Sequence, residues 1–521
     1  MRYTFIFLLI GSFIALTSCR SDFSFEPSTG DLTFSKDTIY LDTVFSNIGS
    51  STYTLKVYNK SEKDIAIPII QLGKGNASKF RMMVDGMEGI DADNSGHGDG
   101  KIFNNVELLA NDSLYIFVET TAEITDANPT DFLYTDQIKF DNGSNLQTVE
   151  LVTLIQDAIF LYPQKYVDQN TGIISYESLP LGDDSIYGFI LDHNEHNDEY
   201  IWTNEKPYVI YGYAGIPEGE TLTINSGARV HFHENSGIIV GNGGSLKING
   251  TVSNTTALEN EVVFEGDRLE PGFADTPGQW GLIWLSQGSI NNEINHLTLK
   301  NATVGLFVSS VENTTSTTLK INNSQIYNSA NVGILARTAK IEGSNLVINS
   351  AGQASLACTE GGDYSFKHCT FNNNWQSSKQ VAVLISNYKT IDEVITNLTL
   401  NKAEFDNCII YGSNQVEVLL DKKTGSPFNY EFNNCLVKFN DAGTNLNGNA
   451  LYDVIRNQQN GIIKNKDPKF FSINQNLLNI DSTSPAVAKG SATYLVPMDI
   501  LGVTRTLPPD IGAYQNAPFP E

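Results

Sequence analysis

Short apolar runs separated by small polar residues dominate the stretch from Pro207 to Asn301. Each run holds three residues rich in Val, Ile, Leu or Phe and is bounded mainly by Gly, Asn, Ser, Thr or charged residues. This spacing predicts strands joined by turns, with no helical periodicity between them. Such strands suit either antiparallel hairpins or the coils of a parallel solenoid, in which the turns carry the chain around one circuit per layer. The runs are Leu222–Ile224, Val230–Phe232, Ile238–Val240, Leu246–Ile248 and Val262–Phe264.

The pattern continues beyond Asn301 and contains a repeat that favours the solenoid. Asn-Cys followed by aliphatic residues occurs at Cys408 and at Cys435, and a similar segment holds Cys369. This repeat fits successive coils in register, with Cys stacked inward as a small apolar residue and Asn bonded to the backbone at the turn. Together with Cys358 these residues form either free stacked thiols, which we favour, or disulfides of an exported protein.

A different strand pattern occupies residues 31–160. Seven or eight short segments, several of them alternating apolar with polar, are separated by turn signals such as NKSEKD and DNGSN. Strands at this spacing predict an antiparallel sandwich of immunoglobulin-like type. The segments SNIGSSTYTLKVYNKSEKDIAI and NDSLYIFVET resemble the immunoglobulin-like modules that stand beside solenoids in surface proteins of the Bacteroidetes group, which implies a spacing and presenting role.

Four motifs carry a second resemblance. They are WTNEKPYVIYG from Trp202, FEGDRLE from Phe264, PGQWGLIW from Pro277 and the closing PDIGAY from Pro509. Together they resemble right-handed parallel β-helix proteins of the pectate-lyase-like architecture, particularly Bacteroidetes lipoproteins. The resemblance implies an all-β chain with a β-helix over 207–480, a less regular connector over 161–206 and a C-terminal cap over 481–521. It leaves the activity open, because this architecture hosts lyases, hydrolases and adhesins alike.

The N-terminus predicts export and a lipid anchor. Residues 1–18 hold one early cation, Arg2, and then an apolar run that is too short to span a membrane, as in a signal peptide. Leu-Thr-Ser-Cys ending at Cys19 resembles a bacterial lipobox, which implies lipidation of Cys19 and attachment to the outer membrane or cell surface. The alternative is a secretory signal that happens to contain a cysteine. Residues 19–30 then form a polar tether.

The net charge of the chain limits the classes of partner that it is expected to bind. Lys and Arg number 33 against 59 Asp and Glu, which gives a formal charge of -26. Such a chain repels phosphate backbones, so a nucleic-acid partner is not expected. A neutral sugar, a cation or another protein is easier to bind than a polyanion.

Two polar segments offer metal ligands. Asp91, Asp93, Ser95 and Asp99 partly match a calcium loop, because their oxygens alternate around a glycine, but no Glu stands at the twelfth position. A polar hairpin insertion is the alternative, so we expect no cofactor unless Ca²⁺ binds here. The connector holds two histidines three residues apart among acids, where a solvated loop is expected rather than a metal site.

No complete catalytic set is visible in the solenoid. A lyase needs carboxylates and a basic residue, for which Asp267, Arg268, Arg337 and Asp363 are the candidates, although their spacing is not diagnostic. Trp280 and Trp284 are expected to pack in the core or the first coil, and Trp375 is a candidate for stacking on a sugar ring. We therefore expect non-catalytic binding of a glycan or protein, with a polysaccharide lyase or glycoside hydrolase as the alternative.

Overall fold

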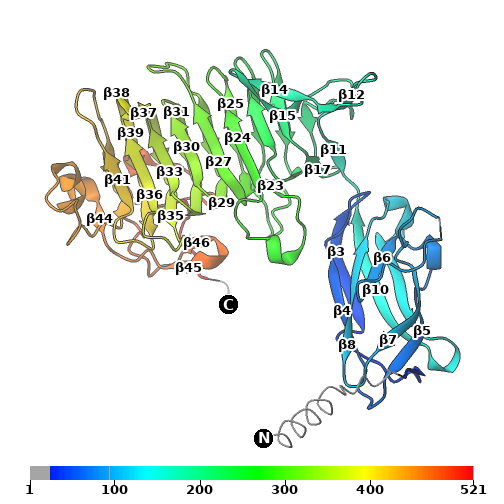
Figure 1. Cartoon of the computed structure of the whole chain (residues 1–521). Coiled ribbons are helices and arrows are strands. Elements are labelled where there is room, and N and C mark those ends of the chain that lie inside the picture. Colours follow the sequence, from blue (N-terminus) through cyan, green and yellow to red (C-terminus); the bar gives the residue numbers. More distant parts are fainter. Residues whose placement is uncertain (1–23, 93, 520–521) are drawn as a thin grey trace, which may run out of the picture. The chain divides into compact units, whose positions relative to one another are not determined.

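The computed structural model describes residues 24–92 and 94–519 and divides the chain into two compact units, Met1–Asp157 and Ala158–Glu521 (Figure 1). Cys19, the expected lipidation site, and Asp93 lie outside the described residues. Among the described residues, none of the helices is long and apolar enough to cross a bilayer.

Unit 1 consists of two sheets that share one core. On β8 (Ser113–Thr120), Leu114, Ile116 and Val118 are buried, whereas Tyr115 and Phe117 between them are exposed. This alternation places one face of each sheet on the core and the other in solvent. The four-stranded sheet is completed by β2 (Thr33–Phe34), β4 (Tyr53–Tyr58) and β6 (Phe80–Val84). The six-stranded sheet contains β1 (Glu26–Pro27), β3 (Thr38–Phe45), β5 (Ile65–Leu72), β7 (Ile102–Leu108), β9 (Leu133–Phe140) and β10 (Gln147–Gln156), and short 3₁₀ turns lie at Gly75–Ala77, Ile124–Asp126 and Gly143–Asn145.

Unit 2 is built from three long sheets through which successive strands cycle in order, so that almost all neighbours are parallel. This pairing is consistent with a parallel β-solenoid, and it excludes the hairpin alternative for most of the unit. The eleven-stranded sheet contains β11 (Ile159–Leu161), β17 (Tyr208–Ile210), β20 (Arg229–Phe232), β23 (Val262–Gly266), β26 (Leu297–Lys300), β29 (Gln325–Ser329), β32 (Val347–Ala351), β35 (Thr370–Asn373), β40 (Ile409–Gly412), β43 (Leu436–Val437) and β44 (Ile463–Lys464).

The other two sheets continue each coil. The ten-stranded sheet contains β14 (Ser178–Leu181), β15 (Asp184–Ile190), β18 (Tyr213–Ile216), β21 (Gly237–Val240), β24 (Trp280–Leu285), β27 (Ala302–Ser309), β30 (Val332–Arg337), β33 (Ala354–Thr359), β36 (Val381–Ser386) and β41 (Val418–Asp421). The nine-stranded sheet contains β16 (Ile201–Trp202), β19 (Thr221–Asn225), β22 (Ser245–Asn249), β25 (Asn292–Asn295), β28 (Leu319–Asn322), β31 (Lys340–Ser344), β34 (Gly362–Lys367), β39 (Leu400–Asp406) and β42 (Glu431–Asn433).

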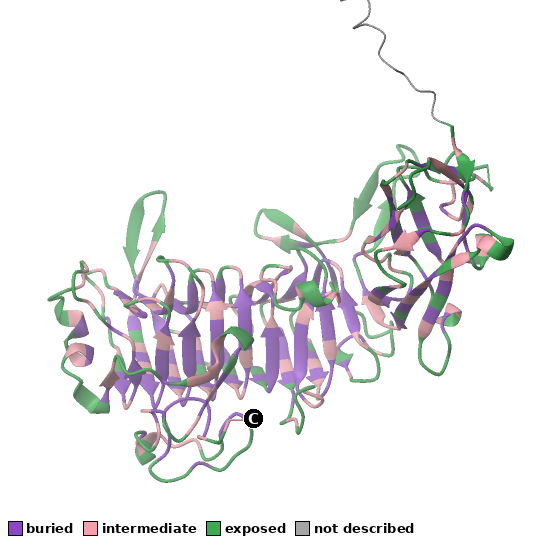
Figure 2. Cartoon of the chain, turned by 90° about the horizontal axis from the view of Figure 1, so that it is seen from below, coloured by how far each residue is buried: buried purple, intermediate pink, exposed green. Residues whose placement is uncertain are grey.

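Three antiparallel hairpins and a few short helices complete the unit. Figure 2 shows exposed hairpins standing out from the buried strands of the solenoid. The hairpins are β12 (Lys165–Val167) with β13 (Ile174–Tyr176), β37 (Tyr388–Ile391) with β38 (Val394–Asn397), and β45 (Phe470–Ser472) with β46 (Leu477–Ile480). The helices are η4 (Pro271–Phe273), η5 (Ala450–Tyr452), α2 (Asp453–Arg456), η6 (Gln459–Gly461), η7 (Ile473–Gln475) and η8 (Ala492–Tyr494).

The turn from the nine-stranded to the eleven-stranded sheet explains the repeated asparagines. Asn345, Asn407 and Asn434 each occupy this turn in the left-handed region, with φ of 51°, 53° and 50°. Asn tolerates this conformation better than most residues because its short polar side chain bonds locally. Asn345 donates to the amide oxygen of Asn323 in the preceding coil at 2.9 Å, which links successive turns.

The core of the solenoid is a stack of apolar side chains from successive coils. Phe366, Phe405 and Phe432 stack with ring centroids 5.5 and 5.2 Å apart. Cys369, Cys408 and Cys435 lie buried beside them, as the sequence repeat predicts. All four described cysteines, including Cys358 on β33, are free thiols.

Residues 161–206 are more regular than the expected connector. They contribute β14, β15 and β16. Strand β15 pairs with β18 and β16 pairs with β19, which adds a first coil to the ten- and nine-stranded sheets, and β14 pairs antiparallel with β15. The short apolar segments here are interrupted by Asp and Asn, which obscured the strand pattern in the sequence.

The C-terminal segment also differs from the expected cap. Instead of closing the end, it packs on the outer face of the eleven-stranded sheet, where Ile500 and Tyr514 meet Tyr327 and Val347. Further along, Ile480 and Ile511 cover Ile409 and Leu436. These sheet residues point outward and are apolar, so burying them favours this position. The last coils are covered instead by Phe439, Tyr452 and Ile455.

Candidate functional site

An unbroken row of apolar side chains runs along the outer face of the ten-stranded sheet. One outward residue from each of seven consecutive strands stands in register with the next. We call this set the apolar row, and it consists of Ile239, Trp284, Phe307, Leu335, Ala357, Leu384 and Leu419. Six of its members are partly exposed, and Ala357 is buried between Leu335 and Leu384, so the row reaches the surface on both sides of Ala357.

A strand irregularity brings Trp284 to this surface. The alternation of buried and outward residues along β24 breaks between Trp280 and Trp284, next to the point where its pairing with β27 shifts register between Leu282 and Ile283. Trp280, before the shift, is 1% exposed in the core, whereas Trp284 points outward. The expectation that both tryptophans pack in the core or the first coil is therefore correct for Trp280, whereas Trp284 lies on the outer face of the sheet.

Trp284 and Phe307 form an aromatic platform within the row. Their rings stack with centroids 5.2 Å apart and an interplanar angle of 28°. The indole N–H of Trp284 donates to the hydroxyl of Ser309 at 3.3 Å, which fixes the ring. The guanidinium of Arg337 lies 5.1 Å above Phe307 and 3.5 Å from Glu360, so it is held at the edge of the platform.

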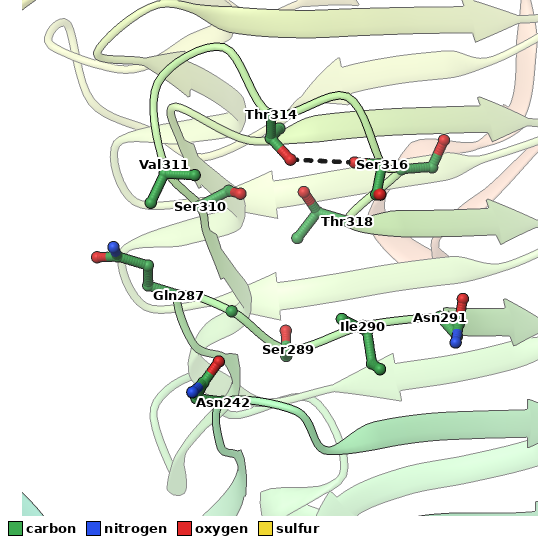
Figure 3. Close-up of a pocket in the computed structure, with 12 residues that line it drawn as sticks. Asn242, Gln287, Ser289, Ile290, Asn291, Ser310, Val311, Thr314, Ser316 and Thr318 are labelled. Carbon is green, nitrogen blue, oxygen red and sulfur yellow. Dashed lines mark hydrogen bonds between the residues drawn. The ribbon is translucent and has the colours of Figure 1, made fainter. Parts of the chain in front are cut away.

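A cavity of about 810 Å³ adjoins the platform, in the turns that follow β24 and β27 (Figure 3). Its polar groups are the amides of Asn and Gln and the hydroxyls of Ser and Thr from consecutive turns, and no ionisable side chain lines it. We call this cavity the neutral pocket, and its lining residues are Asn242, Gln287–Asn291, Ser310, Val311, Thr314 and Ser316–Thr318.

This arrangement suits a neutral, hydroxyl-rich ligand. Amides and hydroxyls both donate and accept hydrogen bonds, and an aromatic face packs against apolar C–H groups. The neutral pocket holds no carboxylate, histidine or lysine among its lining residues, so it supplies no general acid or base. Its amides and hydroxyls can bind and orient a ligand.

The catalytic candidates from the sequence lie on different sheets. Asp267 follows β23 of the eleven-stranded sheet and accepts a hydrogen bond from His233 at 2.7 Å. This bond raises the pKa of His233. Arg268 pairs with Glu270 at 2.8 Å and lies 3.9 Å over the ring of Phe273. Asp267 is thus bonded to the preceding coil, and Arg268 is paired within its own loop.

Arg337 ends β30 of the ten-stranded sheet, whereas Asp363 lies on β34 of the nine-stranded sheet. Asp363 is 3.8 Å from Lys340 and 3.8 Å from Lys402, which belong to the coils on either side. The structure therefore gives Asp363 two lysine neighbours that sequence spacing did not indicate, and it does not bring Asp267 and Arg268 into this group.

Trp375 lies in the turn between β35 and β36 and is partly buried. Its backbone carbonyl accepts a hydrogen bond from Ser413 at 3.1 Å, and its backbone N–H donates to the amide oxygen of Asn373 at 3.1 Å. These bonds order the turn and do not involve the indole ring. The ring is a second aromatic group beside the ten-stranded sheet.

Glu417 anchors the same edge of the sheet. Its side chain is 0% exposed, and its two oxygens accept from the N–H groups of Asn414 at 2.6 Å and Ala382 at 2.8 Å. Burial raises the pKa of Glu417 to about 8, although both backbone donors and Lys438 act in the opposite direction. The carboxyl thus fastens the turn before β41 to the start of β36.

The calcium-ligand candidates Asp91 and Asp99 accept hydrogen bonds from backbone N–H groups of their own loop. Asp91 accepts from the N–H groups of Ser95 and Gly96 at 3.0 and 2.9 Å, and Asp99 accepts from that of Ala92 at 2.9 Å. Within the part of the chain that the structure describes, no group of three or more His, Cys, Asp or Glu side chains is arranged to hold a metal ion.

Sequence reasoning missed the neutral pocket because its residues come from turns separated by whole coils. The available signal was the Ser, Thr, Asn and Gln composition of the turns after β24 and β27. The chain matches no protein-family model and no curated protein.

Proposed function

We propose that this chain is an exported, lipid-anchored protein of the cell envelope that binds a neutral glycan without catalysis. In this proposal unit 1 is an immunoglobulin-like sandwich that spaces the molecule from the membrane. Unit 2 is a right-handed parallel β-helix that carries the binding surface on the apolar row and the neutral pocket.

The observation that supports the proposal most directly is the continuity of platform and pocket. Strands β24 and β27 carry Trp284 and Phe307 and then run into the turns that line the neutral pocket. Aromatic rings beside neutral hydrogen-bonding groups match the alternation of C–H faces and hydroxyls on a sugar. The net charge of -26 favours an uncharged chain over a polyanion.

The anchor is supported by the sequence before Cys19. A lipidated Cys19 would hold the protein on the outer membrane or cell surface, since attachment through more than one acyl chain is stable. Replacing Cys19 by Ser should move the protein from the membrane fraction to the soluble fraction of the envelope. Retention of the C19S variant in the membrane would contradict the lipid anchor.

A polysaccharide lyase or glycoside hydrolase is the second candidate, and Asp363 between Lys340 and Lys402 is the observation that favours it. A carboxylate flanked by lysines contains the residue types that proton abstraction from a sugar needs. Products would separate the two candidates, because a binding protein releases none.

The test uses the chain from Ser21 onward, which keeps every residue of both hydrophobic cores. A panel of neutral and acidic polysaccharides is examined for retention and for unsaturated or reducing-end products, with and without calcium. We expect retention on a neutral polysaccharide and no products. Trp284→Ala should weaken that binding roughly ten- to hundredfold, as for an aromatic anchor.

Trp375→Ala is the matched control, because it removes an indole from the opposite edge of the ten-stranded sheet and leaves platform and pocket intact. It should bind the neutral polysaccharide nearly as well as the parent chain. Equal losses in the two variants, or unchanged binding in the Trp284 variant, would remove the apolar row from the proposal. New products from any polysaccharide would favour the enzyme.

A further inference from the structure

The neutral pocket opens to one side of the apolar row, next to the aromatic platform. Gln287 of the pocket follows Trp284 of the platform by three residues. Ser310 of the pocket follows Phe307 by the same interval, so each pair is separated by at most about 11 Å of chain. Ser309, which accepts the indole N–H of Trp284, directly precedes Ser310. The pocket is thus displaced along the strand direction, whereas the row runs across the strands.

The row continues past the platform in both directions along the solenoid. Ile239 lies one strand before Trp284, and Leu335 and Leu384 lie on strands beyond Phe307. A second set of apolar residues stands in register beside Leu335 and Leu384 and packs with them. This set consists of Val304, Val332, Ala354 and Val381. An extended glycan backbone can therefore cross the platform and keep apolar contacts on both sides of it.

The corner of the solenoid that holds the neutral pocket is closed in the next two coils. Short turns at 338–339 and 360–361 connect β30 to β31 and β33 to β34. The turns after β24 and β27 are longer, at 286–291 and 310–318, and of these four turns they alone line the cavity. A ligand on this part of the row therefore meets a single lateral opening, at the platform.

The turn at 310–318 is held in place as one wall of the pocket. The backbone N–H of Thr399 donates to the carboxylate of Glu312 at 3.2 Å, although two coils lie between their strands. The hydroxyl of Thr317 donates to Glu342 of the next coil at 2.8 Å. Because these bonds already order the wall, a ligand that enters the pocket pays little of the entropy of ordering it.

We propose that the ligand of this surface is a branched neutral glycan, whose backbone lies on the apolar row and whose side branch enters the neutral pocket. This inference rests on the proposed function, because it names the class of glycan that the same surface takes. The backbone sugar at the branch point stacks on Trp284 and Phe307 through its C–H face. The branch is a neutral sugar, since amides and hydroxyls line the pocket and no ionisable side chain does.

A linear glycan reaches the pocket only by ending in it. Such a chain turns from the row into the strand direction at the platform and gives up the apolar contacts on one side. A branch fills the cavity of about 810 Å³, a volume typical of small-ligand sites, while the backbone keeps its contacts in both directions. The branched glycan should therefore bind more tightly than the linear glycan with the same backbone.

Calorimetry with the chain from Ser21 onward compares two pairs of oligosaccharides, each pair sharing one backbone. The first pair is cellotetraose and the xylose-branched xyloglucan oligosaccharide built on the same glucose backbone. The second pair is mannopentaose and mannopentaose with galactose branches. We expect the branched member of at least one pair to bind about ten- to hundredfold more tightly, as for a few additional hydrogen bonds.

Substitutions in the pocket should remove this preference selectively. Gln287 and Ser310 stand on the two turns that border the cavity (Figure 3). Gln287→Ala removes an exposed amide and Ser310→Trp fills the space, so both should lower the affinity for the branched glycan toward that for the linear one. Linear binding should stay unchanged in both. Gln169→Ala removes an exposed amide from the β12–β13 hairpin and should change neither affinity, whereas Trp284→Ala should weaken both.

The outcomes separate this inference from the proposed function. Absence of binding by all four oligosaccharides and by neutral polysaccharides would contradict the proposed function itself. Equal binding of linear and branched members in both pairs, with Trp284→Ala still weakening both, would keep the binding surface and overturn the branch. Equal losses for linear and branched glycans in the Gln287 and Ser310 variants would overturn it as well.

Discussion

Glu417 should make the stability of the solenoid fall as the pH rises. Its carboxyl is buried and bonded to two backbone N–H groups, and burial raises its pKa from the ordinary value of 4.5 to about 8. A carboxyl whose pKa is higher in the folded state binds its proton more tightly there. The folded state is therefore favoured below pH 4.5 and loses this advantage as the pH rises to about 8.

The magnitude follows from the two pKa values. At 1.36 kcal/mol for each pH unit, the interval between them corresponds to about 5 kcal/mol, which is an upper bound because the protein relaxes around a new charge. Glu417→Gln removes the titration. It also costs about 1 kcal/mol at every pH, because the amide nitrogen cannot accept the hydrogen bond that the second carboxyl oxygen accepts.

Urea unfolding followed by tryptophan fluorescence measures this effect in unit 2 alone, because all four tryptophans lie there. The free energy of unfolding of the parent chain should decline by several kcal/mol relative to the Gln variant between about pH 5 and pH 9. Glu393→Gln, on an exposed hairpin turn, makes the same chemical change without burial and should follow the parent chain. Parallel profiles for the parent and the Glu417 variant would refute the reasoning.

Three further predictions concern the core and the C-terminal segment. A thiol reagent should modify none of the four cysteines of the native chain from Ser21 and all four after denaturation, since all are buried. Phe405→Ala should lower the free energy of unfolding by about 3–5 kcal/mol in urea titrations, because it removes the middle ring of a buried stack. Arg505→Ala should speed proteolytic cleavage within residues 481–519, detected by mass spectrometry. The buried guanidinium holds Asn345 at 2.9 Å and the carbonyls of Gly512 and Ala513 at 3.0 Å.

The sequence predicted the repeating strands well because each coil obeys a local rule. Apolar runs of three or four residues form strands, and Asn at the tight turn tolerates a positive φ. The turn positions of Asn407 and Asn434 could therefore be predicted without knowing the fold. The stacking of Cys408 on Cys435 followed from the same periodicity. These features depend on neighbours in the chain and on the identical position one coil away.

The features that escaped prediction depend on register and on remote contacts. A break in the side-chain alternation of β24 places Trp284 on the surface, and no residue type marks that break. The C-terminal segment packs against Tyr327 and Ile409. These side chains face outward because of the register of the assembled sheet, which the sequence alone does not give. For the same reason the lysines around Asp363 came together only when three coils were stacked.

The stacking of successive coils into three sheets also separates the surfaces that lie on different sheets. The apolar row and Asp363 with its neighbours Lys340 and Lys402 lie on different sheets of one solenoid, with the continuous core of Phe366, Phe405 and their neighbours between the sheets. Substitutions on one outer face touch no residue on the other, so their effects on binding should add.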